Sequence, residues 1–270
     1  MRSRLGVILA VYCVHLALAF AFAWPLAKLV ADLALNHPRG DLVLFEPGAT
    51  YLLEAFRLGR ASLTSVAEGS VFAILAVSYL GLLPLAALIY ALAHSGKAMF
   101  ATLVAAAGRF FGTFSLLLGL SLVAMALLGF VPLTIGNLLD DKLKNALGDR
   151  SHDLARAFFR IIALLLVAIV AVVHDLARAA AVSRELPALR AVLVATDVFR
   201  LAAWRAAGAW AIRGAAGILL VMVVAWVTSR LGVETGPRFA MVTLLHQVVV
   251  FALLLLRASW LRSAVVLVTR

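Results

Sequence analysis

Long runs of apolar residues alternate with short polar segments along this chain, and the runs have the length of membrane-crossing helices. A hydrocarbon core of ~30 Å needs about 20 helical residues to cross it. Six segments meet this requirement, and their predicted bounds are 5–30, 71–92, 114–138, 158–177, 212–227 and 239–256. The pattern predicts an all-α integral membrane protein. We expect a single polytopic domain over residues 1–270, with short interfacial helices on both sides of the membrane.

The first apolar run also resembles a secretory signal peptide. Arg2 and Arg4 give it a basic start, and Ala-Phe-Ala at 21–23 has small residues at the spacing of a cleavage site. The apolar run nevertheless continues past that site to Val30, which makes it longer than a usual signal core. We therefore expect an uncleaved first helix. Cleavage would leave five membrane-crossing segments.

Composition supports a lipid environment for most of the chain. Apolar residues make up 65% of the sequence and charged residues only 14%, whereas soluble domains are about half apolar and about a quarter charged. The net charge of +11 fits basic loops that face anionic headgroups. Nucleic acid is not an expected partner, because the arginines separate apolar segments and do not line one polar surface. Cys13 is the only cysteine, so no disulfide forms within the chain.

The distribution of charge between the loops predicts the orientation. With the N-terminus inside, a small majority of the 24 Lys and Arg residues lies on the inner side, as the positive-inside rule requires. Only three acidic residues join them there: Asp175, Glu185 and Asp197. We predict a protein of a bacterial inner membrane with both termini in the cytoplasm.

Several segments outside the spans are expected to form surface elements. Residues 32–70 are the longest exterior loop and include an amphipathic helix at 49–63. Residues 140–156 are the most polar stretch of the chain and are expected to form a solvated helical turn or loop. Small-residue helices are predicted on the cytoplasmic side, at 95–110, 175–193 and 257–268.

A cluster of charged residues interrupts the apolar sequence "VVHDLARAAAV" at 172–182. The 14 uncharged residues from Ile161 to His174 rise only ~21 Å, so Asp175 lies at the edge of the membrane and needs a partner. Arg178 is three positions further along the helix and His174 is four positions before that arginine, so both lie on neighbouring parts of one face. We interpret His174, Asp175 and Arg178 as a structural anchor at the inner headgroup boundary. The alternative is a binding site for a headgroup or a protein partner that opens between helices.

A few polar residues fall inside the predicted spans, notably His15, His246 and Gln247. Ionisable side chains inside a membrane are candidates for function, and imidazoles can relay protons or bind a metal. The structural alternative is a hydrogen bond to neighbouring backbone or side chains. Four tryptophans are expected in the aromatic belts at the headgroup level, namely Trp24, Trp204, Trp210 and Trp260.

No enzyme motif is present in the sequence. The chain has no Gly-x-Ser-x-Gly elbow, no His-Glu-x-x-His zinc pair and no Walker loop. A phosphatidyltransferase motif would need a glycine and further spaced aspartates around Asp175 and Arg178, and these are missing. We therefore expect a non-enzymatic protein with no catalytic residues, no metal and no cofactor.

The six-span layout and the sequence "DLARAAAV" after the fourth span resemble uncharacterised bacterial six-span proteins that are similar to the membrane domain fused to glycerophosphodiester phosphodiesterases. The motif covers Asp175 to Val182. This sequence does not contain the soluble phosphodiesterase domain, so the resemblance implies no hydrolase activity. We expect an accessory or scaffold role in envelope or lipid homeostasis, with a protein partner or self-association as further options. The alternatives are a permease subunit that works with a separate ATPase, and a proton- or metal-dependent carrier that uses His15 and His246.

Overall fold

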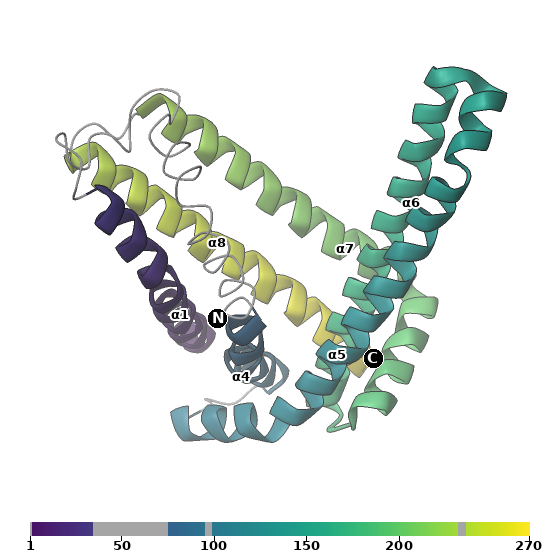
Figure 1. Cartoon of the computed structure of the whole chain (residues 1–270). Coiled ribbons are helices and arrows are strands. Elements are labelled where there is room, and N and C mark those ends of the chain that lie inside the picture. The colour runs from purple at the N-terminus through teal and green to yellow at the C-terminus, as the bar shows by residue number, and fades with distance from the viewer. Residues whose placement is uncertain (1, 35–74, 95–98, 232–235) are drawn as a thin grey trace. The chain divides into compact units, whose positions relative to one another are not determined.

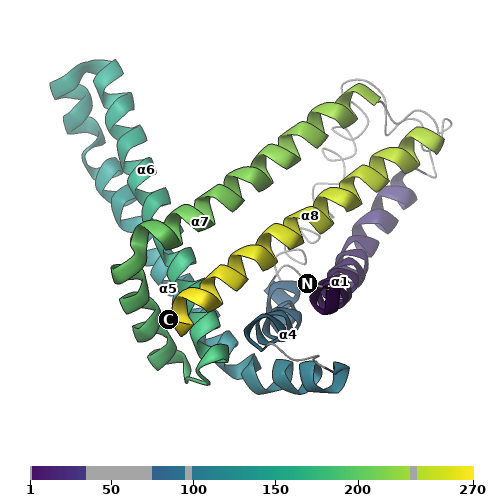
Figure 2. The ribbon, with the colours of Figure 1, turned by 180° about the vertical axis from the view of Figure 1, so that it is seen from behind.

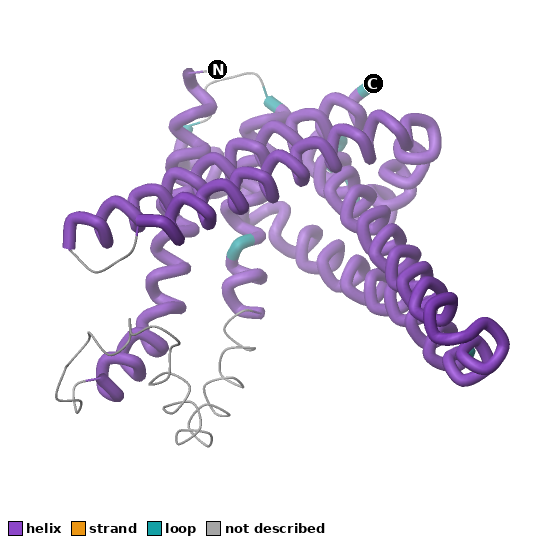
Figure 3. The backbone as a smooth tube through the Cα atoms, turned by 90° about the horizontal axis from the view of Figure 1, so that it is seen from above, coloured by secondary structure: helices purple, strands orange, loops and turns teal. Residues whose placement is uncertain are grey.

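The computed structural model describes residues 2–34, 75–94, 99–231 and 236–270, and these are helical apart from short turns (Figure 3). The predicted exterior helix at 49–63 lies outside them. The helices are α1 (Arg2–Ala34), α4 (Leu82–Ala93), α5 (Phe100–Leu138), α6 (Asp140–Ser183), α7 (Ala188–Leu231) and α8 (Gly236–Thr269). No strand occurs in the described ranges, in agreement with the predicted all-α class.

Five of the described helices are long and apolar enough to cross a membrane. They are Leu75–Ala93, Phe100–Leu138, Asp153–Ser183, Ala188–Leu231 and Gly236–Thr269. The first of these contains α4. In α1, the apolar stretch with described side chains is shorter and runs from Leu5 to Ala21. The chain is therefore a helical protein compatible with several passes through a membrane.

The helices are longer than the predicted spans. The 39 residues of α5 extend about 58 Å, about twice the hydrocarbon thickness. The helices predicted separately at 175–193 and 257–268, and the described part of the one at 95–110, are mostly continuous with the spans beside them. The polar stretch 140–156 is the first part of α6. These boundary predictions were wrong because alanine, leucine, lysine and arginine, which are abundant in these segments, are strong helix formers and continue a helix past its most apolar part.

Contacts within the chain divide it into two compact units. The first contains residues 1–85 and 215–257, and the second contains residues 86–214 and 258–270. In the first unit, the second part of α7 runs beside the first part of α8 (Figure 2). A Cβ built on Gly217 would lie 3.0 Å from Leu253 Cδ2, so glycine at this position permits close helix packing. Because the chain forms two units, its single-domain organisation stays a prediction.

In the second unit, α5 and α6 form a long antiparallel hairpin (Figure 1). Leu139 alone connects them, and its backbone N–H donates to the Ile135 carbonyl. A Cβ on Gly129 would lie 3.2 Å from Val167 Cγ2, and one on Gly136 would lie 3.2 Å from Phe159 Cβ. Glycine therefore lets the two backbones approach each other along the hairpin.

A short turn connects α6 to α7. Glu185 has a φ of 52°, a left-handed conformation that is unfavourable for a residue with a Cβ. Pro187 follows directly before α7, where its fixed φ suits a helix start. Helix α7 is interrupted at Ala202, whose φ of −132° and ψ of 31° are not helical. The segment 188–201 is therefore a separate helical piece within α7.

Candidate functional site: a buried charged cluster on helix α6

The charged cluster on α6 lies inside a helical core. Nearly every side chain from residue 172 to residue 182 is buried, and six of the eleven residues are alanines or valines with minimal exposure: Val172, Ala177, Ala179, Ala180, Ala181 and Val182. These small side chains allow neighbouring helices to approach α6 closely. A helix segment with apolar residues on all sides, as here, is expected in the interior of a protein. The sequence interpretation placed a helix end at this cluster, whereas α6 continues to Ser183.

Asp175 is the centre of the cluster and is 2% exposed. Its Oδ2 accepts a hydrogen bond of 2.7 Å from the indole Nε1 of Trp260 on α8. Trp260 is equally buried, and a buried indole N–H needs an acceptor. The carboxylate thus connects α6 to the end of α8 through a contact between residues 85 positions apart in the sequence.

Arg178 supplies the positive charge for Asp175. Its guanidinium nitrogen lies 3.7 Å from Asp175 Oδ1, which is ion-pair distance but longer than an N–H···O hydrogen bond. The guanidinium carbon also lies 5.8 Å from the ring centroid of Phe114 on α5, within the range of a cation–π contact. The i,i+3 pairing predicted from the sequence is therefore confirmed, and the contact of Arg178 with Phe114 joins α6 to α5.

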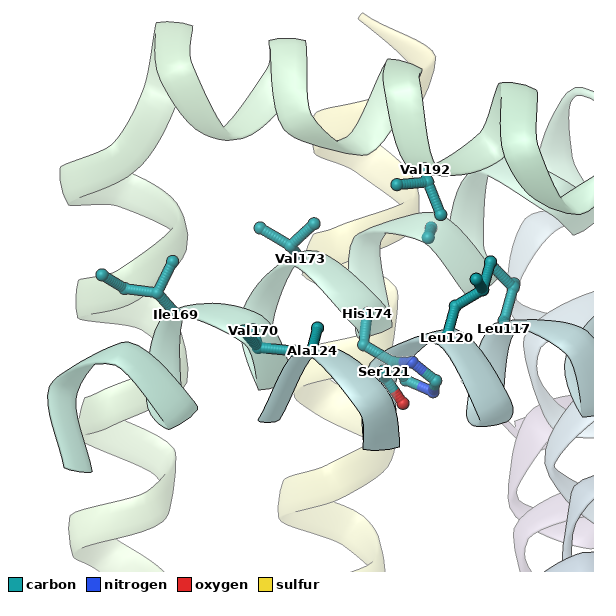
Figure 4. A pocket seen from close by; sticks show the side chains of 10 residues that line it. Leu117, Leu120, Ser121, Ala124, Ile169, Val170, Val173, His174 and Val192 are labelled. Atoms are coloured by element: carbon teal, nitrogen blue, oxygen red, sulfur yellow. The ribbon is translucent and has the colours of Figure 1, made fainter. Parts of the chain in front are cut away.

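His174 is buried on the same turn of α6 but lines a different feature. Its side chain contributes to a crevice formed with residues of α5, among them Leu120, Ser121 and Ala124. Figure 4 shows the His174 ring and the Ser121 hydroxyl in the same part of this crevice. The cluster therefore has two sides, because Asp175 bonds to α8 while His174 lines the crevice against α5.

A second set of polar contacts joins α7 to the last part of α8. Arg213 donates from Nε to Ser259 Oγ and from a terminal nitrogen to Ser263 Oγ, both at 3.0 Å. A third nitrogen donates to the Ala209 carbonyl at 2.8 Å. The four-residue spacing of the two serines places them on one face of α8, so one guanidinium binds both.

Two further arginine contacts connect the turn after α6 to other helices of the second unit. Arg109 on α5 forms a two-nitrogen ion pair with Glu185, with distances of 3.1 and 2.8 Å. Arg184 donates to the Val268 carbonyl near the C-terminus of α8, where a helix has carbonyl groups without helical partners. The turn between α6 and α7 is thus bonded to α5 through Glu185 and to α8 through Arg184.

The three intramembrane candidates all lie in the first unit. His15 and His246 are exposed, and Nδ1 of each ring lies 2.8 and 2.7 Å from the carbonyl four residues earlier, Val11 and Val242 respectively. This is the backbone bonding that the structural alternative predicts. Among the described residues, no group of three His, Cys, Asp or Glu side chains is placed to hold a metal ion.

Gln247 connects two helices of the first unit. Its Oε1 accepts a hydrogen bond of 2.8 Å from the hydroxyl of Tyr12 on α1. The Tyr12 ring also meets Phe251 of α8 edge-on, at a centroid distance of 5.4 Å. Gln247 therefore contributes to helix association, as polar side chains in membranes often do.

Sequence reasoning missed the partners that complete these contacts. Trp260 was expected in an aromatic belt but is buried against Asp175. The signal was the apolar spacing of Trp260, Ala264 and Val268, which are four residues apart and therefore share one helix face. Phe114 and Arg213 carried no local signal, because only the folded chain shows which charge or hydroxyl each contacts.

Comparison with known proteins adds no relative. No family model, no curated protein and no solved structure matches this chain.

Proposed function

We propose that this chain is a six-span protein of a bacterial inner membrane with a non-catalytic, accessory or scaffold role in envelope or lipid homeostasis. Helix α1 is 33 residues long and would supply the sixth span beside the five helices of membrane length. In this proposal α1 is retained and both termini are cytoplasmic. The resemblance to the membrane domain of glycerophosphodiester phosphodiesterases is part of the same proposal.

The burial of the charged cluster supports a non-catalytic role. The buried charges of the second unit are engaged in helix packing, since Asp175 accepts from Trp260 and Arg178 lies against Phe114. A catalytic carboxylate needs access to a substrate, and Asp175 is 2% exposed. Breaking a buried ion pair is strongly destabilising, because it leaves a buried charge uncompensated. This supports the structural-anchor interpretation of the cluster.

The interruption of α7 supports contact with anionic headgroups. Leu201 and Trp204 are 89% and 91% exposed and lie on either side of the break at Ala202. Arg200 and Arg205 flank them and are also exposed. Arginines next to exposed leucine and tryptophan are typical of a segment at the membrane interface. In this proposal residues 200–205 lie at the inner headgroup level.

A pull-down from native membranes in mild detergent tests the scaffold role. We expect a partner to co-purify with the unmodified chain and to be lost from Asp175→Asn, because the second unit then loses its anchor. The matched control is Asp197→Asn, which removes an exposed carboxylate from an i,i+3 ion pair of the same 3.7 Å length. Catalytic turnover of any lipid by the purified chain would overturn the non-catalytic role.

The orientation has its own experiment. Cys13→Ser removes the only thiol, and single cysteines can then be introduced by Ser151→Cys or Arg270→Cys. A membrane-impermeant maleimide added to intact cells is expected to label Ser151→Cys and to leave Arg270→Cys unlabelled until the membrane is opened. Labelling of Arg270→Cys in intact cells would contradict a cytoplasmic C-terminus.

A permease subunit is the second candidate, and one observation favours it. The helical piece 188–201, set apart by the turn before it and by Ala202 after it, lies between α6 and the remainder of α7 in the sequence. A short cytoplasmic helix in that position could dock on a separate ATPase. Co-purification of a nucleotide-binding subunit, abolished by changes at exposed Leu189 and Leu193, would favour the permease over the scaffold.

A further inference from the structure

An apolar crevice in the second unit has the chemistry of a lipid-binding site. Its volume is about 170 Å³, and it is formed by ten residues from α5, α6 and the start of α7 (Figure 4). Ser121 and His174 are the only polar residues among them. The Ser121 hydroxyl donates to the Leu118 carbonyl at 2.9 Å, so it is engaged within its own helix. The crevice therefore offers an almost wholly apolar surface.

An apolar space of this size is unfavourable for water. An apolar cavity of about 150 Å³ in a protein stays dry and binds apolar molecules such as benzene. Atoms that line an empty space lose the dispersion contacts that a neighbour would supply. The chemistry of the crevice between Leu120, Ala124 and Val170 thus favours an apolar ligand over water.

The exposed lining residues show which medium the crevice opens to. Leu120 and Ile169 line it and remain partly exposed, so they mark its mouth. Leu116 and Leu165 are also exposed on the same two helices. Both helices are long and apolar enough to cross a membrane, so the mouth faces hydrocarbon when the hairpin is inserted.

We propose that this crevice binds one acyl chain of a membrane phospholipid. The proposal depends on the membrane placement in the proposed function but not on the scaffold role. His174 lines the crevice and Asp175, the next residue, bonds to Trp260 on α8. A bound chain therefore supports the turn of α6 that carries the anchor, and its occupancy stabilises the second unit.

Photocrosslinking tests the site in the full chain. The protein is reconstituted in vesicles of phosphatidylglycerol and phosphatidylcholine that contain a trace of phosphatidylcholine with a diazirine in its acyl chain. After irradiation, crosslinked residues are mapped by mass spectrometry. We expect crosslinks to concentrate on 117–124 and 169–177, above the level on exposed Leu127 and Phe130 of the same hairpin.

A matched pair of variants separates binding from general lipid contact. Ala124→Leu fills the crevice and is expected to lower crosslinking there about tenfold, the change produced by about 1.4 kcal/mol of binding free energy. Ala126→Leu makes the same substitution at an exposed position two residues away and is expected to leave crosslinking unchanged. Equal crosslinking in both variants would overturn the proposal.

A competition measurement covers the case in which Ala124→Leu does not fold. Unlabelled phospholipid added to the detergent-solubilised, unmodified chain is expected to suppress crosslinking in the crevice with saturation, while crosslinks at Leu127 fall in simple proportion to dilution. Crosslinking that falls in proportion to dilution both in the crevice and at Leu127 would overturn the proposed binding site. Loss of the scaffold partner in a pull-down is a separate result and leaves this comparison unaffected.

Discussion

The indole Nε1 of Trp260 donates a 2.7 Å hydrogen bond to Oδ2 of Asp175. The two residues come from α8 and α6, and both side chains are almost completely buried. The contact explains why an aspartate is present in an otherwise apolar helix segment, since the carboxylate holds a large aromatic side chain of a distant helix in one position. The stability of the second unit should therefore depend on both residues.

Removing the charge of Asp175 should destabilise the protein strongly. Asp175→Asn leaves Arg178 buried without its counter-charge, and breaking a buried ion pair costs about 3–5 kcal/mol. Asp197→Asn is the control, because Asp197 and Arg200 have the same spacing and the same 3.7 Å separation but are 70% and 78% exposed, where a pair contributes about 0–1 kcal/mol. Denaturation in detergent measures the free energy of unfolding of both variants. An equal decrease in both would show that burial does not strengthen the Asp175–Arg178 pair.

The hydrogen bond of Trp260 can be tested with a substitution that keeps an aromatic ring. Trp260→Phe removes the N–H and part of the packing, so we expect a loss of about 2–4 kcal/mol, since a hydrogen bond to a charged group contributes about 1.5–3 kcal/mol. Trp204→Phe, at a position that is 91% exposed, should change the stability by less than about 0.5 kcal/mol. The midpoint of thermal unfolding in detergent distinguishes the two variants. A similar decrease in both would show that the hydrogen bond of Trp260 to Asp175 does not stabilise the protein.

The left-handed conformation of Glu185 predicts that alanine and glycine at this position differ in their effect on stability. Glu185→Ala removes the ion pair with Arg109 and keeps a Cβ at φ 52°. Glu185→Gly removes the same ion pair but relieves the strain, which is about 1–2 kcal/mol for a residue in this region. We expect the glycine variant to be the more stable of the two by about 1 kcal/mol. An alanine variant at least as stable as the glycine variant would show that the turn is unstrained.

The α5–α6 hairpin should be sensitive to a methyl group at Gly136. A Cβ there would lie 3.2 Å from Phe159 Cβ, and overpacking of this kind typically costs about 1–3 kcal/mol. Gly119→Ala on the same helix meets nothing within 4 Å, so it should be neutral or stabilising, because alanine is favoured over glycine in helices by about 0.5–1 kcal/mol. Unfolding in detergent gives the stability of the two alanine variants. Destabilisation by Gly119→Ala alone would contradict the close packing of Gly136 against Phe159.

The contact between Tyr12 and Gln247 predicts that the first helix is retained in the mature protein. Intact mass spectrometry of the chain from membranes should show the full N-terminal segment, whereas cleavage after residue 23 would remove Tyr12 from the first unit. Tyr12→Phe deletes only the hydroxyl that donates to Gln247 and should cost about 0.6 kcal/mol, the mean for hydrogen bonds between membrane helices. A shortened chain in the mass spectrum would rule out the retained α1.

The sequence alone determined that this protein consists of long apolar helices. Apolar runs of about 20 residues predict membrane-length helices because hydrocarbon thickness imposes that length, and the helices at 100–138 and 153–183 are among the five found. Local spacing also paired Asp175 with Arg178, since residues three apart on a helix are neighbours. Helix ends were predicted less well, because alanine-rich segments such as 175–183 continue a helix whether or not lipid surrounds them.

Only the tertiary structure decided which distant side chains complete each contact. Nothing near Asp175 in the sequence points to Trp260, because a hydrogen bond across 85 positions depends on how α6 and α8 pack. His174 and Asp175 are adjacent in the chain yet face different neighbours, the crevice beside α5 and the indole of α8. The periodicity of a helix gives the direction of a side chain relative to its own helix axis, and the packing of helices determines what lies in that direction.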